Sequence, residues 1–529
     1  MASSKATLVV ALAALLVTVT TCGATPRLKL APTKLPRATL ASRTPPPATL
    51  ASTTRPSATV VLDSNAPTQR VPPSYLGFST EYWAMPLWER HMSLFERVLS
   101  LERVPGYGPL LIRIGGDSTD HALFDLRNMT RLPSGVFELT PDWFSKVSTL
   151  VSDIDARTLL DLNLVTDLPQ MAGLWARAAE TQLPRGSIKG YEIGNEPDLY
   201  DPLYWSDILS PLARILKIKL FPHGLAPDAY VQLYKSYASV LANFAPGVPL
   251  VAPVIAYPVQ DLAWIARLLG APHPRLGMVS AHMYPYSACA PQLSPLYPTI
   301  PRLLSEGATA GMANALRPAI ELAHHAGYPF RLTELNSVTC GGLPGVSDTF
   351  ATALWAPDAL FELLRAGVDG VNIHVRVYAV NAAFALTDKG LLARPLLYGL
   401  VLFTRTVGPD ALRVGLRVHT ASSVDLKAWA VRVRGGTLHV LLINKSNHAV
   451  TVGVALPTSG LATVQRLLAP SPAARSGITL DGQQLGRDGR WHGRPATAAI
   501  APGRYGYELT VPAVSAALLS ANLRPGSRP

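Results

Sequence analysis

Eight short apolar runs, each rich in β-forming residues, recur along this chain with helical stretches between them. Such alternation of strand and helix is typical of βα units. Eight successive units predict an α/β fold in which the strands close into a (β/α)8 TIM barrel. The predicted strands are residues 75–83, 110–118, 157–166, 190–198, 249–255, 278–285, 330–337 and 370–376.

The segments between these runs have the periodicity of helices. Tyr230, Tyr234, Tyr237 and Leu241 recur at helical spacing, which predicts a helix with one apolar face packed on the barrel. A second helix is predicted over residues 349–367, interrupted at its internal proline.

Near residue 408 the helical pattern stops, and the apolar and polar residues begin to alternate around short turns. Residues 409–529 are therefore predicted to form a C-terminal antiparallel β-sandwich domain, after a barrel domain of residues 58–408. Residues 58–63, ATVVLD, precede the barrel and are candidates to join the sheets of the β domain.

The N-terminus has the layout of a secretory signal peptide. Lys5 precedes an apolar stretch over residues 6–19, and small residues continue to residue 24. This stretch is too short to span a bilayer comfortably, so secretion without a stable membrane span is expected. A lipid anchor at Cys22 is the alternative. Residues 25–57 are rich in Pro and Thr and are predicted to be a linker.

Lys and Arg outnumber Asp and Glu by 47 to 35, so the net charge is +12 and acidic partners should gather near the surface. The basic residues occur singly and no RNA-binding motif is found, which argues against nucleic acid. A carbohydrate, including an anionic polysaccharide or the glycan of a proteoglycan, is the expected partner.

Polar and ionisable residues gather at the ends of the predicted strands, where a TIM barrel carries its active site. These residues are Glu81, Asp117, Asp120, Asp167, Asn195, Glu196, His282, Tyr284, Glu334, Asn336, His374 and Arg376.

Two of them, Glu196 after the fourth strand and Glu334 on the seventh, form the pair of carboxylates that glycoside hydrolysis requires. Glu196 closes an apolar strand and follows Asn195, which is placed to bond a sugar hydroxyl. Tyr284, on the sixth strand, is placed to donate to Glu334 and keep it ionised. A structural ion pair between Glu334 and Arg331 is the alternative for the second glutamate.

No metal site and no cofactor are predicted. His282 and His374 occur without HxH or HExxH spacing, and the two glutamates already supply the acids that hydrolysis needs. The histidines are expected to orient neighbouring side chains or to close the floor of the barrel.

The motifs RIGGDSTD, YEIGNEPDLY, RLTELNSVTCGGLPGVSDTFATALW, GVNIHVRV and LLYGLVLF resemble those of glycoside hydrolase family 79, the β-glucuronidases and heparanase relatives. The resemblance runs from about residue 58 to residue 525. It implies cleavage of β-glucuronides with retention of configuration, with Glu196 as acid/base and Glu334 as nucleophile.

The same resemblance implies further roles at matching motif positions. It assigns Glu81 and Asp117 to sugar hydroxyls, Asn195 to the 2-hydroxyl, and His282 and Tyr284 to the side of the nucleophile. Members that bind glucuronate surround the sugar carboxylate with Gly and Tyr groups after strand eight. This chain has VRVYAVNAAFAL there, so Arg376 or Tyr378 is expected to take that role, with Tyr284 as the alternative.

Cys289 follows the sixth strand and Cys340 follows the seventh by similar distances along the chain. Neighbouring parallel strands lie about 4.8 Å apart, so loops leaving their ends start close enough for a bridge. A disulfide between them is predicted, with two unrelated thiols as the alternative.

Two other functions fit the same pattern. One is a retaining glycosidase of the same fold that acts on a neutral sugar, such as a xyloside, glucoside or arabinoside. The other is a carbohydrate-binding protein on a barrel without catalysis, which is disfavoured because such proteins usually lack one of the two carboxylates.

Overall fold

The computed structural model describes residues 56–124, 137–165, 168–200, 224–458 and 460–524, which belong to one compact unit. The expected signal peptide of residues 1–24, the candidate anchor Cys22 and almost all of the linker lie outside the described residues, as does Asp167.

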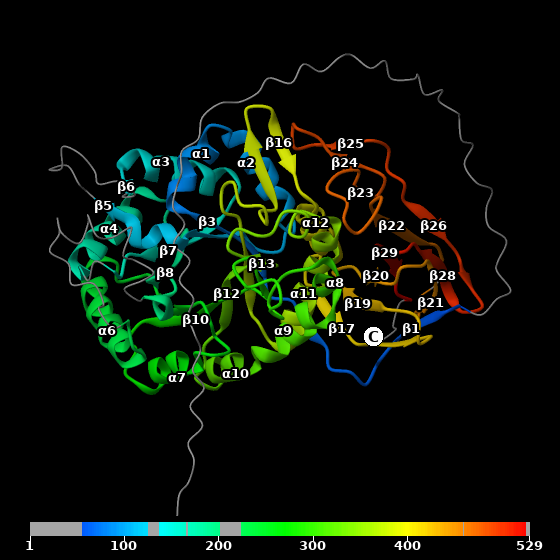
Figure 1. Ribbon diagram of the computed structural model, residues 1–529, viewed down its shortest axis with the longest axis horizontal. Helices are drawn as coiled ribbons and strands as arrows, with labels where there is room; N and C mark the ends of the chain where they lie inside the picture. Colours follow the sequence, from blue (N-terminus) through cyan, green and yellow to red (C-terminus); the bar gives the residue numbers. More distant parts are fainter. Residues whose placement is uncertain (1–55, 125–136, 166–167, 201–223, 459, 525–529) are drawn as a thin grey trace, which may run out of the picture. The chain divides into compact units, whose positions relative to one another are not determined.

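Eight parallel strands form a closed barrel in the order β10-β12-β14-β3-β4-β7-β8-β9 (Figure 1). Each strand lies within or beside one of the eight apolar runs, so the predicted barrel is confirmed. The strands are β3 (Leu76–Glu81), β4 (Leu111–Gly115), β7 (Arg157–Leu162), β8 (Ile188–Ile193), β9 (Leu250–Ile255), β10 (Leu276–Met283), β12 (Phe330–Leu335) and β14 (Gly370–His374).

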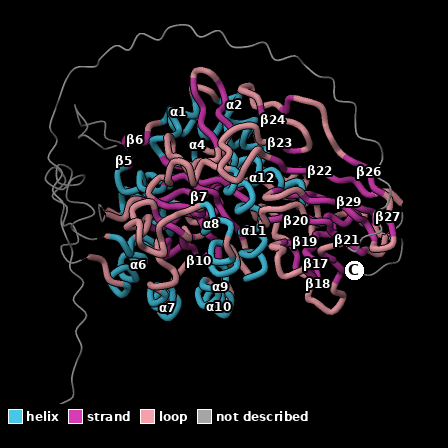
Figure 2. The backbone as a smooth tube through the Cα atoms, turned by 45° about the vertical axis from the view of Figure 1, so that its right-hand side comes forward, coloured by secondary structure: helices cyan, strands magenta, loops and turns pink. Residues whose placement is uncertain are grey.

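Helices cover the outside of the barrel, and Figure 2 shows them in cyan around the magenta strands. Several begin with a proline, whose fixed φ suits the first turn and whose missing N–H has no partner there anyway. No described helix has both the length and the apolar character needed to cross a membrane. The helices that follow the eight strands are α2 (Met92–Leu101), α3 (Pro141–Asp153), α4 (Pro169–Gln182), α6 (Pro227–Phe244), α7 (Leu262–Gly270), α10 (Arg317–His325), α11 (Phe350–Ala366) and α12 (Pro395–Thr406).

The interruption predicted at Pro357 is wrong, because α11 continues through this residue. Proline removes one N–H, so the carbonyl of Ala353 loses its partner within the helix. Gly399 of α12 packs against that carbonyl so closely that a side chain there would clash. Nearly every residue of α11 is buried, and this packing outweighs a proline cost of about 3 kcal/mol.

Two sheets form the C-terminal β domain, one in the order β18-β1-β21-β28-β27 and one in the order β2-β17-β19-β20-β29-β22-β23. Their described pairings are antiparallel except that β1 runs parallel to β21. Figure 1 shows β1 in blue among these late strands. The strands are β1 (Ala58–Leu62), β2 (Gln69–Arg70), β17 (Leu412–Val414), β18 (Leu416–Thr420), β19 (Leu426–Arg432), β20 (Thr437–Asn444), β21 (Val450–Ala455), β22 (Ala462–Leu468), β23 (Thr479–Leu480), β27 (Pro502–Gly503), β28 (Gly506–Val511) and β29 (Ser515–Asn522).

Strand β19 shows how the β domain attaches to the barrel. Successive side chains of a strand point to opposite faces. Ala430 lies in the core between the two sheets, whereas Trp429 belongs to the core of the barrel. The Trp429 ring stacks on Phe361 of α11 at 5.3 Å between centroids, and its Nε1 donates to Asp358 at 3.0 Å. Lys445 pairs with the other oxygen of Asp358 at 2.7 Å, so the buried carboxylate is satisfied.

Candidate active site

The carboxyl ends of the barrel strands surround a cavity in which the two predicted glutamates meet. Glu334 lies near the end of β12, and Glu196 follows β8. A carboxylate oxygen of each and a ring nitrogen of His282 lie within 4.8 Å of one another. Retaining glycosidases separate their carboxyl groups by about 5–5.5 Å, whereas inverting enzymes need about 6.5–9.5 Å. The lining residues are Asp117, Glu196, Tyr284, Glu334, Thr339, Cys340, Gly341, His374, Arg376 and Asn381.

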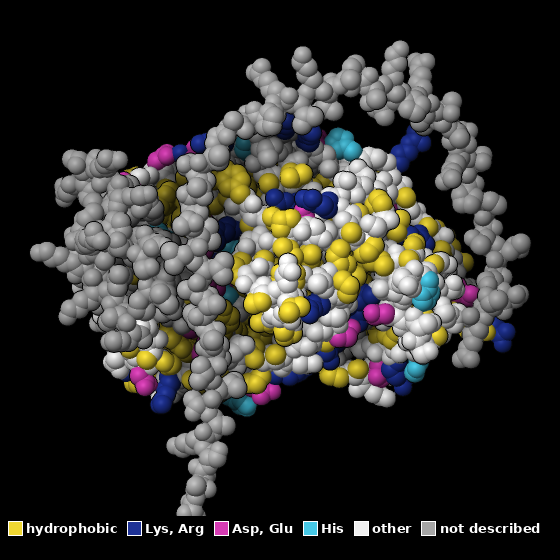
Figure 3. All heavy atoms as spheres, viewed as in Figure 1, with side chains coloured by type: hydrophobic (Ala, Val, Ile, Leu, Met, Phe, Trp, Pro, Cys, Tyr) yellow, Lys and Arg dark blue, Asp and Glu magenta, His cyan; other side chains and the backbone are white. Residues whose placement is uncertain are grey.

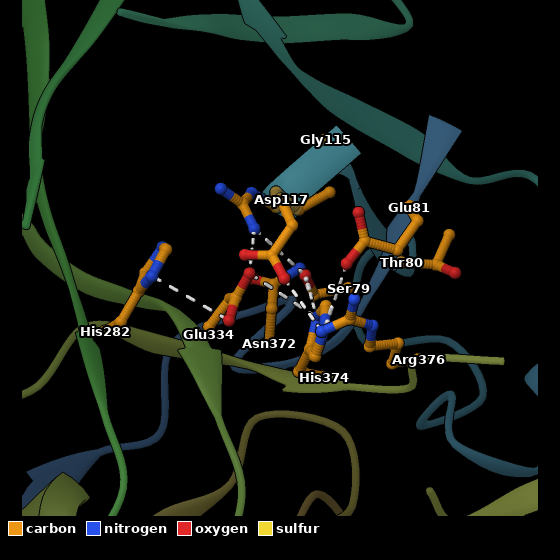
Figure 4. A network of polar contacts seen from close by, with 12 residues as sticks. Ser79, Thr80, Glu81, Gly115, Asp117, His282, Glu334, Asn372, His374 and Arg376 are labelled. Atoms are coloured by element: carbon orange, nitrogen blue, oxygen red, sulfur yellow. Dashed lines mark hydrogen bonds and ion pairs between the residues drawn. The ribbon is translucent and has the colours of Figure 1, made fainter. Parts of the chain in front are cut away.

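Glu334 is buried among groups that stabilise its ionised form. Tyr284 donates to Oε2 at 2.7 Å, as its place on the preceding barrel strand suggested, and Arg113 donates to Oε1 at 2.5 Å. Figure 4 shows His282 and His374 on opposite sides of Glu334. Burial alone would raise the pKa of this carboxyl, but the charges of His374, His282 and Arg113 hold the pKa well below its usual range.

Arg113, in the middle of β4, connects the nucleophile position to the rest of the site. Its guanidinium is fully buried and also donates to Glu192 at 2.7 Å, to Asp161 at 3.1 Å and to Asn195 at 2.8 Å. No role was predicted from the sequence for Arg113, Asp161 or Glu192. The available signal was a charged residue inside each of three neighbouring apolar strands, which is costly unless the charges meet.

Glu196 sits at a sharp bend of the backbone. Its φ of 49° lies in the left-handed region, and its N–H donates to the carbonyl of Val254 on β9 at 2.9 Å. The Glu196 side chain remains partly exposed, and its Oε1 lies 2.8 Å from Nδ1 of His282. His282 is 3.8 Å from Glu334, so it contacts the predicted acid/base more closely than the nucleophile side to which it was assigned.

Asp117 and Arg376 form an ion pair of 2.7 Å at the edge of the cavity (Figure 4). Burial, followed by the charge of Glu81, raises the pKa of Asp117 to about 7, against the lowering effect of Arg376. The Arg376 guanidinium also lies 6.0 Å from the centre of the Trp83 ring. A cation is therefore held at the mouth of the site by a carboxylate and an aromatic face.

Three other predicted binding residues lie off the cavity surface. Glu81 is fully buried and accepts from the backbone N–H of Ser118 at 2.8 Å, and Asn195 accepts from Arg113. Tyr378 does not face the cavity, because its side chain is 81% exposed and its backbone turns away with a φ of 68°. Of the two candidates after strand eight, only Arg376 lines the cavity.

The predicted disulfide between Cys289 and Cys340 is present, with 6.0 Å between the Cα atoms. It joins the loops that follow β11 (Tyr286–Ser287) and β13 (Val338–Thr339), two short strands that pair in parallel. Because Cys340 lines the cavity, the bridge fixes part of the active-site wall to a neighbouring loop.

Glu196, His282 and Glu334 are the residues of the described chain whose ligand atoms lie close enough together to hold a metal ion. Hydrogen bonds explain why these three residues lie together. His282 bonds Glu196, and Glu334 is bonded by Tyr284 and Arg113. We therefore interpret the three residues as a pair of catalytic carboxyl groups with a histidine beside them.

Comparison with known proteins identifies relatives of both domains. Residues 428–518 match the glycosyl hydrolase family 79 C-terminal beta domain. A beta-glucuronidase of Neurospora crassa is 23% identical over 484 residues, covering 81% of this chain and 82% of the relative. A beta-glucuronidase of Aspergillus niger is 25% identical over 514 residues, covering 84% of this chain and 90% of the relative.

Solved structures share the fold at lower identity. A 4-O-α-L-rhamnosyl-β-D-glucuronidase from Fusarium oxysporum 12S superimposes with a TM-score of 0.70 at 17% identity, covering 87% of this chain and 99% of that chain. A family 51 arabinofuranosidase from Xanthomonas axonopodis pv. citri has a TM-score of 0.63 at 13% identity, covering 88% of this chain and 100% of that chain.

A closed barrel with a carboxylate pair at its mouth and an attached β domain defines a glycoside hydrolase. The match of the C-terminal domain and the similarity to two beta-glucuronidases support an assignment of the chain to glycoside hydrolase family 79.

Proposed function

We propose that this protein hydrolyses β-glucuronides with retention of configuration, Glu334 acting as nucleophile and Glu196 as acid/base. The approach of the two carboxylates to within 4.8 Å carries the proposal, because this spacing suits direct attack on the anomeric carbon. The beta-glucuronidases among the relatives support the choice of sugar.

In the first step, an oxygen of Glu334 attacks the anomeric carbon while the bond to the leaving oxygen breaks. The lowered pKa of Glu334 keeps it ionised for this attack. Glu196 gives its proton to the leaving oxygen. When Nδ1 of His282 carries a proton, it donates to Oε1 of Glu196, so the other carboxyl oxygen holds the proton to be transferred.

In the second step, Glu196 acts as a base. It takes a proton from water, and the oxygen of that water attacks the anomeric carbon and displaces Glu334 from the sugar. Arg113 and Tyr284, which bond the two oxygens of Glu334, stabilise the carboxylate as it leaves.

Arg376 is the group that we assign to the sugar carboxylate. It lines the cavity, and its ion pair with Asp117 and its place beside Trp83 hold the guanidinium at the mouth of the site. An arginine recognises a carboxylate through charge-assisted hydrogen bonds, which a neutral sugar cannot form.

A panel of 4-nitrophenyl glycosides tests this proposal. The β-glucuronide should exceed the β-glucoside in kcat/KM by at least about tenfold, because a hydrogen bond to a charged group contributes about 1.5–3 kcal/mol. Arg376→Gln should remove most of that preference, whereas Arg434→Gln, at an exposed ion pair of the β domain, should leave it unchanged. Equal rates on both sugars, or preference for the xyloside or arabinofuranoside, would assign the protein to neutral glycosides.

We further propose that the protein is secreted and acts on anionic substrates outside the cell. The disulfide near the active site fits an oxidising compartment, and the net charge of +12 favours anionic substrates. Fractionation of the native host, with the processed N-terminus read from the mature protein, tests this localisation.

A further inference from the structure

Most exposed large apolar side chains of the described chain lie on loops that follow the carboxyl ends of barrel strands. Isolated exposed apolar residues are ordinary, but their concentration at the end of the barrel that carries the active site indicates a binding surface. The residues on these loops are Tyr257, Val259, Leu293, Leu296 and Tyr378. Leu392 lies on β16 (Gly390–Ala393), a hairpin strand between β14 and α12, whereas Leu174 lies on α4 and Leu461 in the β domain.

The strand order places four of these side chains on one side of the mouth. Glu196 follows β8, and the next strands around the barrel are β9 and β10. Tyr257 and Val259 follow β9, while Leu293 and Leu296 lie between β10 and α8 (Ile300–Leu304). An acid/base protonates the oxygen of the leaving group, so the leaving group occupies the side of the mouth where Glu196 lies.

Hydrogen bonds hold Tyr257 close to Glu196. The carboxylate of Asp198, two residues after Glu196, accepts from the backbone N–H groups of Ala256 and Tyr257, each at 2.9 Å. Partial burial raises the pKa of the Tyr257 hydroxyl, and the negative charges of Glu196 and Asp198 raise it further. The backbone of Tyr257 is therefore fixed beside the acid/base, and its ring is half-exposed.

The loop that carries Leu293 and Leu296 is also well bonded, although Leu293 is 98% exposed. Ser294 donates its N–H to Pro291 at 2.8 Å, and Arg302 donates to the carbonyl of Ser294 at 2.8 Å. The carbonyl of Leu296 accepts from β11 at 2.9 Å. Because these hydrogen bonds fix the loop, Leu293 and Leu296 are held with their side chains exposed to solvent. Figure 3 shows hydrophobic side chains spread over this face, including the part where Figure 1 places α8 and β13.

We infer that Tyr257, Val259, Leu293 and Leu296, here called the aglycone wall, contact the leaving group, and that the protein acts on glucuronides of large apolar alcohols or phenols. This inference rests on the proposed function and narrows its substrate class. A polysaccharide leaving group would place hydroxyls against these apolar side chains, which offer no hydrogen-bond partner apart from the Tyr257 hydroxyl.

The test compares kcat/KM for hexyl β-D-glucuronide, methyl β-D-glucuronide and a glucuronyl-galactose disaccharide. The wild type should favour the hexyl over the methyl glucuronide about tenfold, because added methylene groups are taken out of water, and should favour it over the disaccharide. Leu293→Ser/Leu296→Ser should reduce the hexyl-to-methyl ratio at least threefold. The matched control Leu174→Ser/Leu461→Ser, which changes two exposed leucines elsewhere on the surface, should keep the wild-type ratio.

A binding measurement separates failure of this inference from failure of the proposed function. Saturation-transfer NMR on the Glu334→Gln protein should show contact with the hexyl protons of hexyl β-D-glucuronide and of hexyl β-D-glucoside, and the Leu293→Ser/Leu296→Ser change should weaken both. If methyl glucuronide is cleaved without a preference for the hexyl glucuronide, the inferred role of the aglycone wall is wrong, whereas the proposed glucuronidase activity stands. If no glucuronide is cleaved but the hexyl protons still contact the protein, the assignment of glucuronate as the sugar is wrong, whereas the inferred role of the aglycone wall stands.

Discussion

Two buried glutamates at opposite ends of the barrel have opposite pKa shifts. Glu334, at the ends of the strands, is bonded by Arg113 and Tyr284, and its pKa is lowered. Glu102 lies beside a cavity near the starts of β3 and β4, and its oxygens have no hydrogen-bond partner among the described residues. Burial raises the pKa of Glu102 to about 8. Burial is common to both sites, so the surrounding charges and donors decide which glutamate is ionised at neutral pH.

Exchanging each carboxyl for an amide should give the largest contrast between the two sites. Glu334→Gln should lower kcat at least about 10⁴-fold, because removing a covalent nucleophile abolishes its step. Glu102→Gln, the same change at the other end of the barrel, should keep kcat within about twofold of the wild type. Steady-state rates on 4-nitrophenyl β-D-glucuronide provide the comparison. A Glu334→Gln protein with substantial activity would place the nucleophile elsewhere.

Replacing Arg113 by Met should make the surroundings of Glu334 more like those of Glu102. Three buried carboxylates lose their shared cation, and breaking buried pairs costs about 3–5 kcal/mol in the free energy of unfolding. The pKa of Glu334 should rise, so kcat/KM should decline at a higher pH on the acid side, where the nucleophile becomes protonated. Urea unfolding and a pH–rate profile measure the two effects. An unchanged acid limb would show that Arg113 does not tune the nucleophile.

Glu102 itself should make the stability of the protein depend on pH. Its pKa in the folded state is about 8, against a usual value of 4.5, so the folded state keeps a proton that the unfolded chain releases between these values. The free energy of unfolding should therefore fall as pH rises from 4.5 to 8, by up to about 5 kcal/mol. Glu102→Gln should flatten this slope in chemical unfolding at several pH values. Parallel slopes for both proteins would mean that Glu102 is ionised or solvated when folded.

The features that the sequence predicted are those with local signals. The eight apolar runs, the two glutamates at strand ends and the two cysteines after neighbouring strands each follow from position along the chain and the geometry of a barrel. Arg113 was missed because its burial is tolerable only once Asp161, Glu192 and Glu334 meet around it, and that meeting depends on three other strands.

Two local signals were overridden by the surroundings. Pro357 normally ends a helix, but α11 is packed on nearly all sides and continues through it. Tyr378 follows β14 closely enough to reach the cavity, yet a turn with a positive φ leaves it on the surface. Spacing along the chain predicts which residues lie at the end of a strand. It does not predict the direction that the backbone takes after the strand.

The stereochemistry of the first product tests the central claim, a double displacement through Glu334, most directly. Proton NMR recorded during the first minutes of hydrolysis of 4-nitrophenyl β-D-glucuronide resolves the anomeric proton of the free sugar before mutarotation mixes the two forms. The close carboxylate pair predicts that β-glucuronic acid forms first and that the α form grows in later. Initial release of the α form would show direct attack by water and would contradict the assignment of Glu334 as a covalent nucleophile.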